Sequence, residues 1–215
     1  PNWPYDWSEF VTYEPITDAN FQDAVNLWFS DEANATYTYG HISDWNVSQV
    51  TDMSNAFQNR SSFNEDISGW DVSSVTSMFR IFAFASSFNQ PISTWDVSSV
   101  KDFEYTFWYA TAFNKSIVDW NISSAENMGS MFSGASSFNQ PLNLWDVSSV
   151  TAMDYLFNEA QSFNQTIVDW NIGNVTNMQH IFKGQNALSN SNKGLIHKSF
   201  SSNPNWPYDW SEFVV

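Results

Sequence analysis

The chain has no cysteine among its 215 residues, and only 7 lysines and arginines against 23 acidic residues. Without cysteine it can form no disulfide, thiolate metal site or cysteine nucleophile. The net charge of −16 excludes a general nucleic-acid binder and argues against docking on anionic lipid, because both need a basic surface. No run of about 18 apolar residues occurs, so no membrane insertion is predicted.

Glycine and proline are also scarce, with seven of each. The chain begins at Pro1, with neither an initiator methionine nor a signal peptide, so we expect a mature or excised piece of a longer protein. Hydrophobic residues make up 42% of the chain and aromatic residues 18%. This content can fill a core, and the acidity therefore does not indicate disorder.

A tryptophan recurs at a constant spacing through the middle of the chain, at Trp45, Trp70, Trp95, Trp120, Trp145 and Trp170. Valine or isoleucine follows each of them after two residues, methionine or phenylalanine after eight, and phenylalanine after twelve. One such unit cannot close a core alone, whereas stacked units bury a continuous apolar column. Six repeats therefore predict a solenoid.

Within each repeat we expect a short strand followed by a short helix. Ile92 and Trp95 lie in a polar-flanked segment typical of a strand, whereas Val75, Met78 and Phe82 have the spacing of one helical face. The predicted fold is an α/β, leucine-rich-repeat-like solenoid of six 25-residue strand–helix coils with helical N- and C-terminal caps.

The sequence Trp-Asp-Val-Ser-Ser-Val-Thr at 70–76, followed by Met78, Phe82 and Ala-Ser-Ser-Phe-Asn-Gln at 85–90, resembles the BspA-type leucine-rich-repeat family. That family was first noticed in bacterial surface proteins and mycoplasma lipoproteins. The resemblance covers residues 41–189 directly and extends to the flanks. It implies a curved strand–helix solenoid displayed outside the cell, used for adhesion or as matrix, with no catalytic residue.

Both ends of a solenoid must hide an apolar layer. We expect an N-terminal helical cap at 16–41, with its helix at 18–29, then the six repeats at 42–189 and a C-terminal helical cap at 190–203. The apolar stripes of the two cap helices are Phe21, Val25, Trp28 and Phe29 in the first, and Leu195, Ile196 and Phe200 in the second.

Residues 1–11, Pro-Asn-Trp-Pro-Tyr-Asp-Trp-Ser-Glu-Phe-Val, recur unchanged at 204–214. The simplest explanation is a tandem array with a 203-residue period. Residues 1–15 would then be the tail of a preceding unit, and 204–215 a connector. A lone domain with two similar ends stays open as the alternative. Residues expected at the contact between units are Trp3, Pro4, Tyr5, Trp7, Trp206, Pro207, Tyr208 and Trp210.

No group of residues predicts catalysis or a cofactor. The three histidines are scattered without metal-ligand spacing, and no motif singles out a serine nucleophile. Aspartate and asparagine interchange one residue after the repeat tryptophan, which is typical of a turn rather than a titrating catalyst. We therefore predict no enzyme and no metal site, while weak calcium binding along the aspartate ladder stays open.

Seven Asn-x-Ser/Thr sequons would be N-glycan acceptors in a protein secreted by a eukaryotic cell. Asn34 and Asn59 are the strongest candidates, because they fall in polar loops outside the repeat ladder. Asn46, Asn121 and Asn174 are intermediate. Asn114 and Asn164 are weaker, because they belong to an asparagine column that we expect to hydrogen-bond the backbone between coils.

Together these observations predict an extracellular or cell-surface structural glycoprotein. Its 203-residue units would stack head-to-tail into a fibre, filament or surface matrix. The partners would be copies of the chain itself, with glycans or other surface proteins as further partners. The alternative is a surface adhesin or carbohydrate-binding module.

Overall fold

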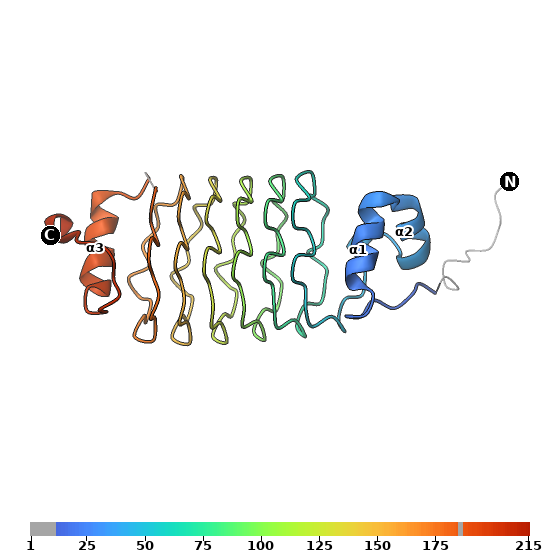
Figure 1. Ribbon diagram of the computed structural model, residues 1–215, viewed down its shortest axis with the longest axis horizontal. Helices are drawn as coiled ribbons and strands as arrows, with labels where there is room; N and C mark the ends of the chain where they lie inside the picture. Colours follow the sequence, from blue (N-terminus) through green and yellow to red (C-terminus); the bar gives the residue numbers. More distant parts are fainter. Residues whose placement is uncertain (1–11, 185–186) are drawn as a thin grey trace.

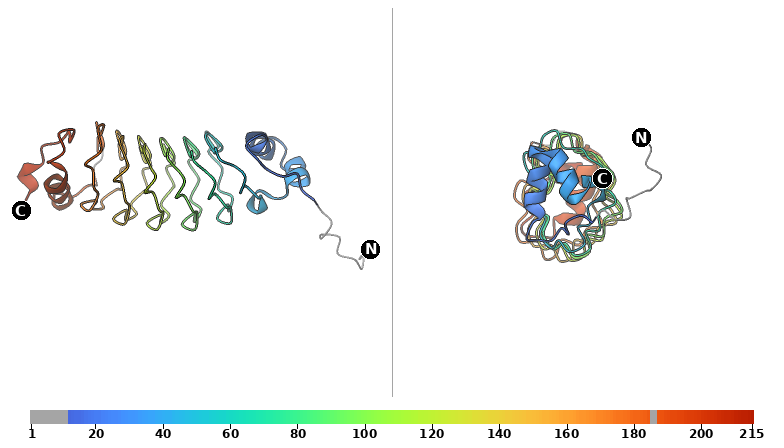
Figure 2. Two further views of the ribbon diagram at one scale, coloured as in Figure 1. Left: turned by 90° about the horizontal axis from the view of Figure 1, so that it is seen from below. Right: turned by 90° about the vertical axis from the view of Figure 1, so that its right-hand side faces the viewer.

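A computed structural model describes residues 12–184 and 187–215, in which the repeats form a row of stacked coils with helices at both ends (Figure 1). Helices α1 (Phe21–Ser30) and α2 (Glu32–Tyr39) precede the coils, and the 3-10 helix η2 (Ile42–Asp44) leads into the first. Helix α3 (Asn190–Phe200) and the 3-10 helix η3 (Ser211–Phe213) follow the last. Seen along the stack, the coils lie one behind another (Figure 2).

The predicted α/β fold of strand–helix coils is wrong. From Trp45 to Gly184 the chain contains neither an α-helix nor a β-strand. Neighbouring coils are instead joined by isolated parallel bridges, one at each step from coil to coil. These bridges are Asp52↔Ser77, Ser77↔Asp102, Asp102↔Asn127, Asn127↔Ala152 and Ala152↔Asn177.

Successive tight turns explain why the repeat has a helix-like spacing. In the coil that begins at Trp70, several backbone N–H groups donate to the carbonyl three residues earlier, at 2.9–3.2 Å. The donors include Val75, Ile81, Ala85 and Phe88. The first and last residues of each of these four turns are buried, and the residues between them are more exposed, apart from the buried Ala83. Turns in series therefore repeat the spacing of three that one face of a helix produces.

Two residues in every coil adopt the left-handed backbone conformation, ten and fourteen positions after the repeat tryptophan. They are Asn55, Asn59, Arg80, Phe84, Tyr105, Tyr109, Ser130, Gly134, Tyr155, Glu159, His180 and Gly184. For a residue other than glycine this conformation costs about 1–2 kcal/mol. Hydrogen bonds to the next coil hold it in place, as from Arg80 N–H to the Glu104 carbonyl at 3.0 Å.

Each repeat tryptophan after Trp45 joins its coil to the preceding one through the indole N–H, whereas Trp45 donates to the Gly40 carbonyl. Between coils the acceptor is the carbonyl oxygen of the apolar residue three positions before the preceding repeat tryptophan, at 2.8–3.1 Å. The pairs are Trp70 with Ile42, Trp95 with Ile67, Trp120 with Ile92, Trp145 with Ile117 and Trp170 with Leu142. Because the indoles are almost fully buried, these bonds satisfy carbonyl groups that water cannot reach.

Paired phenylalanine rings fill the rest of the core. Within one coil, Phe82 and Phe88 stack with their ring centroids 3.9 Å apart. Phe82 in turn stacks on Phe57 and Phe107 of the neighbouring coils, at 5.6 Å in each case. The apolar columns seen in the sequence are therefore the continuous core of the stack.

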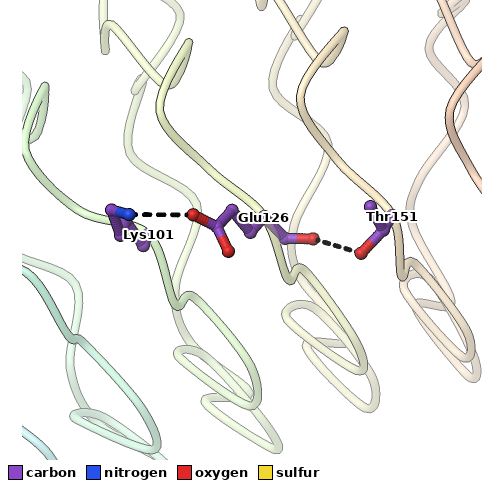
Figure 3. A network of polar contacts seen from close by, with 3 residues as sticks. All are labelled: Lys101, Glu126 and Thr151. Carbon is purple, nitrogen blue, oxygen red and sulfur yellow. Dashed lines mark hydrogen bonds and ion pairs between the residues drawn. The ribbon is translucent and has the colours of Figure 1, made fainter.

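An exposed row of residues, six positions after the repeat tryptophan, also links the coils. Thr76 Oγ1 donates to the Thr51 carbonyl at 3.1 Å, and Thr151 Oγ1 donates to the Glu126 carbonyl at 3.2 Å. Where threonine is replaced, Lys101 Nζ pairs with Glu126 Oε1 at 3.0 Å (Figure 3). Because both charged side chains are more than half exposed, this pair contributes only about 0–1 kcal/mol.

Replacing a repeat indole by a phenyl ring tests the tryptophan ladder. We expect Trp120→Phe to lower the free energy of unfolding by about 2–4 kcal/mol, because the buried Ile92 carbonyl loses its donor and the smaller ring leaves a void. Trp108→Phe, the same change at a half-exposed position, should cost about 1 kcal/mol or less. Equal losses in urea denaturation would contradict the role of the N–H.

Glycine-to-alanine changes test the left-handed positions. Gly134 has φ +70°, and an added Cβ would lie 2.7 Å from the ring of Tyr109. Gly134→Ala should therefore destabilise the chain by about 1–3 kcal/mol. At Gly69 an added Cβ meets nothing within 4 Å, so Gly69→Ala is the matched control and should be neutral or slightly stabilising. Thermal unfolding of both variants decides the point.

Candidate functional site: the two ends of the coil stack

Helix α1 closes the N-terminal end of the stack by packing its apolar side on the first coil. Trp28 meets Trp45 edge-on with ring centroids 6.2 Å apart, and Phe29 meets Phe63 at 5.7 Å. A carboxylate completes the closure, because Asp18 accepts from the Thr51 backbone N–H at 2.7 Å and from Thr51 Oγ1 at 2.6 Å. The hydrogen bonds from Thr51 hold the pKa of Asp18 below its usual value.

This Thr51 N–H is the equivalent of the Thr76 N–H, which donates to the Thr51 carbonyl of the preceding coil. Asp18 thus replaces the acceptor that an earlier coil would have provided. Nothing in the repeat pattern marks Asp18, so sequence reasoning had no signal for this role.

The helices at this end differ in part from those expected. Helix α1 spans Phe21–Ser30 rather than 18–29, and Thr17, just before it, forms a parallel bridge to Gln49. Helix α2 was not predicted, because Ala35 is its one buried residue and it has no apolar stripe. Its start is fixed by the Asp31 side chain, which accepts from the Asn34 N–H at 3.1 Å.

At the other end, the second copy of the repeated segment folds back on its own chain. Phe182 of the last coil contacts three aromatic rings of this segment, with centroids 5.6–6.4 Å apart; these rings belong to Trp206, Tyr208 and Trp210. Trp206 Nε1 also donates to His197 Nδ1 of α3 at 3.0 Å. The C-terminal closure therefore consists of α3 and this aromatic segment.

Polar groups of the closure replace those of a missing coil. In the preceding coil the Phe157 N–H donates to the Ile181 carbonyl, whereas the equivalent Phe182 N–H donates to the hydroxyl of Tyr208 at 3.0 Å. Asn203 Nδ2 donates to the Ile172 and Val175 carbonyls at 2.7 and 3.1 Å. Burial raises the pKa of Tyr208 above its ordinary value of 10.0.

The residues expected at a contact between units are thus divided by the structure. Trp206, Tyr208 and Trp210 are half-buried against their own chain, and Pro207 is exposed. The other four, Trp3, Pro4, Tyr5 and Trp7, lie outside the described residues. A contact with a neighbouring unit stays a prediction for the whole set.

Exposed large apolar side chains gather at the two ends of the described chain. Tyr13 and Tyr37 are 49% and 86% exposed at the N-terminal end, and Leu195 and Val214 are 48% and 40% exposed at the other. Within the coils, Leu144 is the exception at 67%. Since such side chains are usual where proteins meet, the ends are the candidate interaction surfaces.

A groove of about 390 Å³ runs between α3 and the C-terminal segment, lined by Leu195, Lys198, Phe213 and Val214 among others. Gly194 brings the two elements close together, because a Cβ there would lie 2.0 Å from the carbonyl oxygen of Phe213. The groove therefore depends on a glycine at this position.

The sequons occupy different settings. We expected Asn34 and Asn59 in loops outside the ladder. Asn34 lies in α2 instead, and Asn59 lies inside the coil stack at a left-handed position. Both are exposed, as are Asn46 and Asn121, whose side-chain oxygens accept from Ser48 and Ser123. Asn174 is exposed too, but its side-chain nitrogen donates to the Ser148 carbonyl at 2.7 Å.

Two polar columns have the structural roles expected of them. The asparagine column links the coils, as Asn114 Oδ1 accepts from the Asn139 N–H at 3.0 Å and Asn164 Oδ1 accepts from the Ser189 N–H at 2.9 Å. The Asp/Asn column after the tryptophan closes turns, as Asp71 Oδ1 accepts from the Ser73 N–H at 3.1 Å. In the turn the hydrogen bonds from Ser73 lower the pKa of Asp71.

Within the described ranges, no three histidine or acidic side chains gather closely enough to hold a metal ion. No helix in those ranges is long and apolar enough to cross a membrane.

The architecture defines a repeat protein of stacked 25-residue coils, closed by a helical cap at one end and by a helix with an aromatic segment at the other. A family described as "Mycoplasma protein of unknown function, DUF285" matches residues 25–142 and 115–203. The chain belongs to this family, since the two matches cover most of its length. Comparisons with curated proteins and with solved structures gave no match.

Removing one hydroxyl tests the C-terminal closure. We expect Tyr208→Phe to lower the free energy of unfolding by about 1–3 kcal/mol, because the Phe182 N–H loses its acceptor.

The same variant should also change how the free energy of unfolding depends on pH. With its pKa raised, folded Tyr208 stays protonated while the unfolded tyrosine ionises near 10, so this contribution to stability is complete below pH 10 and falls as the pH rises further. Urea unfolding at pH 8 and above pH 10 should show a smaller alkaline loss in Tyr208→Phe than in the parent. An unchanged alkaline loss would rule out Tyr208 as its source.

Proposed function

We propose that the chain is one unit of an extracellular structural array, in which 203-residue units join end to end into a fibre, filament or surface matrix. The observation that carries this proposal is the repeated segment. Its second copy closes the coil stack of its own chain, and its first copy stands directly before the N-terminal cap. In an array, that first copy is the closing segment of the preceding unit.

The distance available between units supports direct contact. Val11 corresponds to Val214, so residues 12–16 alone separate the closing segment of one unit from Thr17, which bridges to the first coil of the next. At about 3.3–3.6 Å per residue, this link reaches no more than about 20 Å. In the proposed array, the groove beside α3 faces the α1–α2 end of the following unit.

The two ends differ in charge. The described N-terminal part, residues 12–41, has five acidic side chains and no lysine or arginine, whereas at the C-terminal end Lys193 and Lys198 of α3 offset Asp209 and Glu212 of the closing segment. Both ends also expose large apolar side chains, Tyr37 at one and Leu195 at the other. Contact between unlike ends repeats from unit to unit, and it gives a filament where the rotation between units does not close a ring.

The similarity to BspA-type surface proteins supports a place outside the cell, and no catalytic activity is proposed. If a eukaryotic cell secretes the protein, the exposed sequons at Asn34, Asn46, Asn59 and Asn121 are the better glycan acceptors. Asn114, by contrast, is half-buried and has its side-chain oxygen in the asparagine column. The strongly acidic outer surface would keep such an array soluble along its sides.

A chain of two consecutive units tests the proposal. If the ends pack together, the two-unit chain should unfold at a higher temperature than the single chain, because each unit stabilises its neighbour. Leu195→Glu in the first unit should remove this difference. Leu144→Glu is the matched control, since Leu144 is even more exposed but lies within the coils, and it should leave the difference in place.

Electron micrographs of the two-unit chain give a second measurement, with straight rods of constant length expected. Two units that unfold at the single-unit temperature and hinge freely about the link would contradict the proposal.

A further inference from the structure

One coil is smaller than its neighbours on a single side of the stack. The coil that begins at Trp120 has glycine or serine at four outward positions, Gly129, Ser130, Ser133 and Gly134. The preceding coil has Glu104, Tyr105, Trp108 and Tyr109 at the same positions, and the following coil has Asp154, Tyr155, Asn158 and Glu159. The side of the stack is therefore notched at this coil.

The notch is a cleft of about 270 Å³, lined by Tyr105, Trp108, Tyr109, Ser130, Ser133, Tyr155 and Asn158. The Tyr105 and Trp108 rings form an aromatic wall on one side of the cleft, and Arg80 of the coil before packs against this wall. The Tyr105 and Trp108 rings contact each other with centroids 5.0 Å apart, and the Arg80 guanidinium lies 4.8 Å from the Tyr105 ring and 5.9 Å from the Trp108 ring. Because Tyr105 and Trp108 are half-exposed, these packed rings also face solvent.

The floor of the cleft is polar. Ser130 and Ser133 are 7% and 2% exposed, and Asn158 Nδ2 donates to Ser133 Oγ at 3.0 Å. The Ser133 hydroxyl proton is thereby directed away from Asn158. The floor thus offers both donors and acceptors beside apolar rings.

Carboxylates stand at both borders of the notch. An added Cβ at Gly129 would lie 3.4 Å from Glu104 Cγ on one side and 3.4 Å from Asp154 Oδ1 on the other. Burial, and then the nearby Asp102, raise the pKa of Glu104. At the opposite border the Tyr109 hydroxyl donates to Glu159 Oε2 at 2.8 Å, across Gly134. These carboxylates stand outside the residues that line the cleft, and those of Glu104 and Glu159 already accept from Asn127 and Tyr109.

We propose that this cleft binds a neutral saccharide, with one pyranose ring stacked on the Tyr105–Trp108 wall and its hydroxyls bonded to Ser130, Ser133 and Asn158. The C–H face of a sugar packs on an aromatic ring, while its hydroxyls both donate and accept. The acidic border and the net charge of −16 select against anionic sugars. The site is independent of the contact between units, so either proposal can fail without the other.

Two other ligands fit the cleft less well. An organic cation would use the rings and the carboxylates, but it would provide no acceptor for the Ser130 hydroxyl or for the second amide proton of Asn158, whose first amide proton is donated to Ser133 Oγ. A proline-rich peptide prefers a longer aromatic groove, whereas this notch is one coil wide. Both become competing ligands in the test.

The experiment titrates the full chain with methyl glycosides of glucose, galactose, mannose and N-acetylglucosamine, followed by calorimetry and tryptophan fluorescence. We expect saturable binding of at least one, with a dissociation constant of about millimolar. Trp108→Ala should weaken it at least tenfold. Ser133→Trp should do the same by filling the notch, and the preceding coil shows that the backbone accepts tryptophan at this position.

Tyr37→Ala is the matched control, because Tyr37 is 86% exposed on α2, far along the sequence from the notch, and this variant should bind as the parent does. Unfolding curves establish that each variant is folded. No binding to any glycoside would overturn the proposal. It would equally fail if binding survived both notch variants, or if choline or a proline-rich peptide bound more tightly than every sugar.

Discussion

Every coil of this protein depends on backbone hydrogen bonds to its neighbours, because it contains no helix or sheet that could satisfy its buried amides internally. Turns use some of these groups, and the remainder pair along the stack with groups of the adjacent coils. Every coil must therefore keep the same length, and an end coil without a neighbour would leave buried backbone groups unpaired. Asp18 at one end, and Tyr208 with Asn203 at the other, provide the partners that further coils would have supplied.

Aromatic packing offsets the strain that this backbone carries. Left-handed residues recur twice per coil, mostly without glycine, and the conformation persists because phenylalanine and tryptophan columns pack every coil at one spacing. The sides of the stack are therefore free to differ in function from its ends. The identical columns inside leave the outward positions free to vary, and the notch beside Trp108 is the result of one such variation.

The sequence predicted what is buried better than it predicted the backbone. The tryptophan, valine, methionine and phenylalanine columns are in the core, and the asparagine column bonds between coils as expected. The strand and helix assignments were wrong, because burial at every third residue does not distinguish turns in series from a helix. Helix α2 has no apolar stripe, so periodicity could not find it. The notch was detectable from the sequence, because Gly129–Gly134 differs from the equivalent residues of the neighbouring coils. Periodicity reports only the positions that the repeats share, so it did not reveal this difference.

The tryptophan ladder has a consequence for how such a protein changes over generations. From Trp70 on, each repeat indole bonds the equivalent carbonyl of the coil before it, so the backbone contacts between coils are the same at every step. Duplicating or deleting one coding repeat in frame would lengthen or shorten the rod by a single step. The number of coils sets the length of the molecule, and recombination between near-identical repeats can alter that number while the caps stay unchanged.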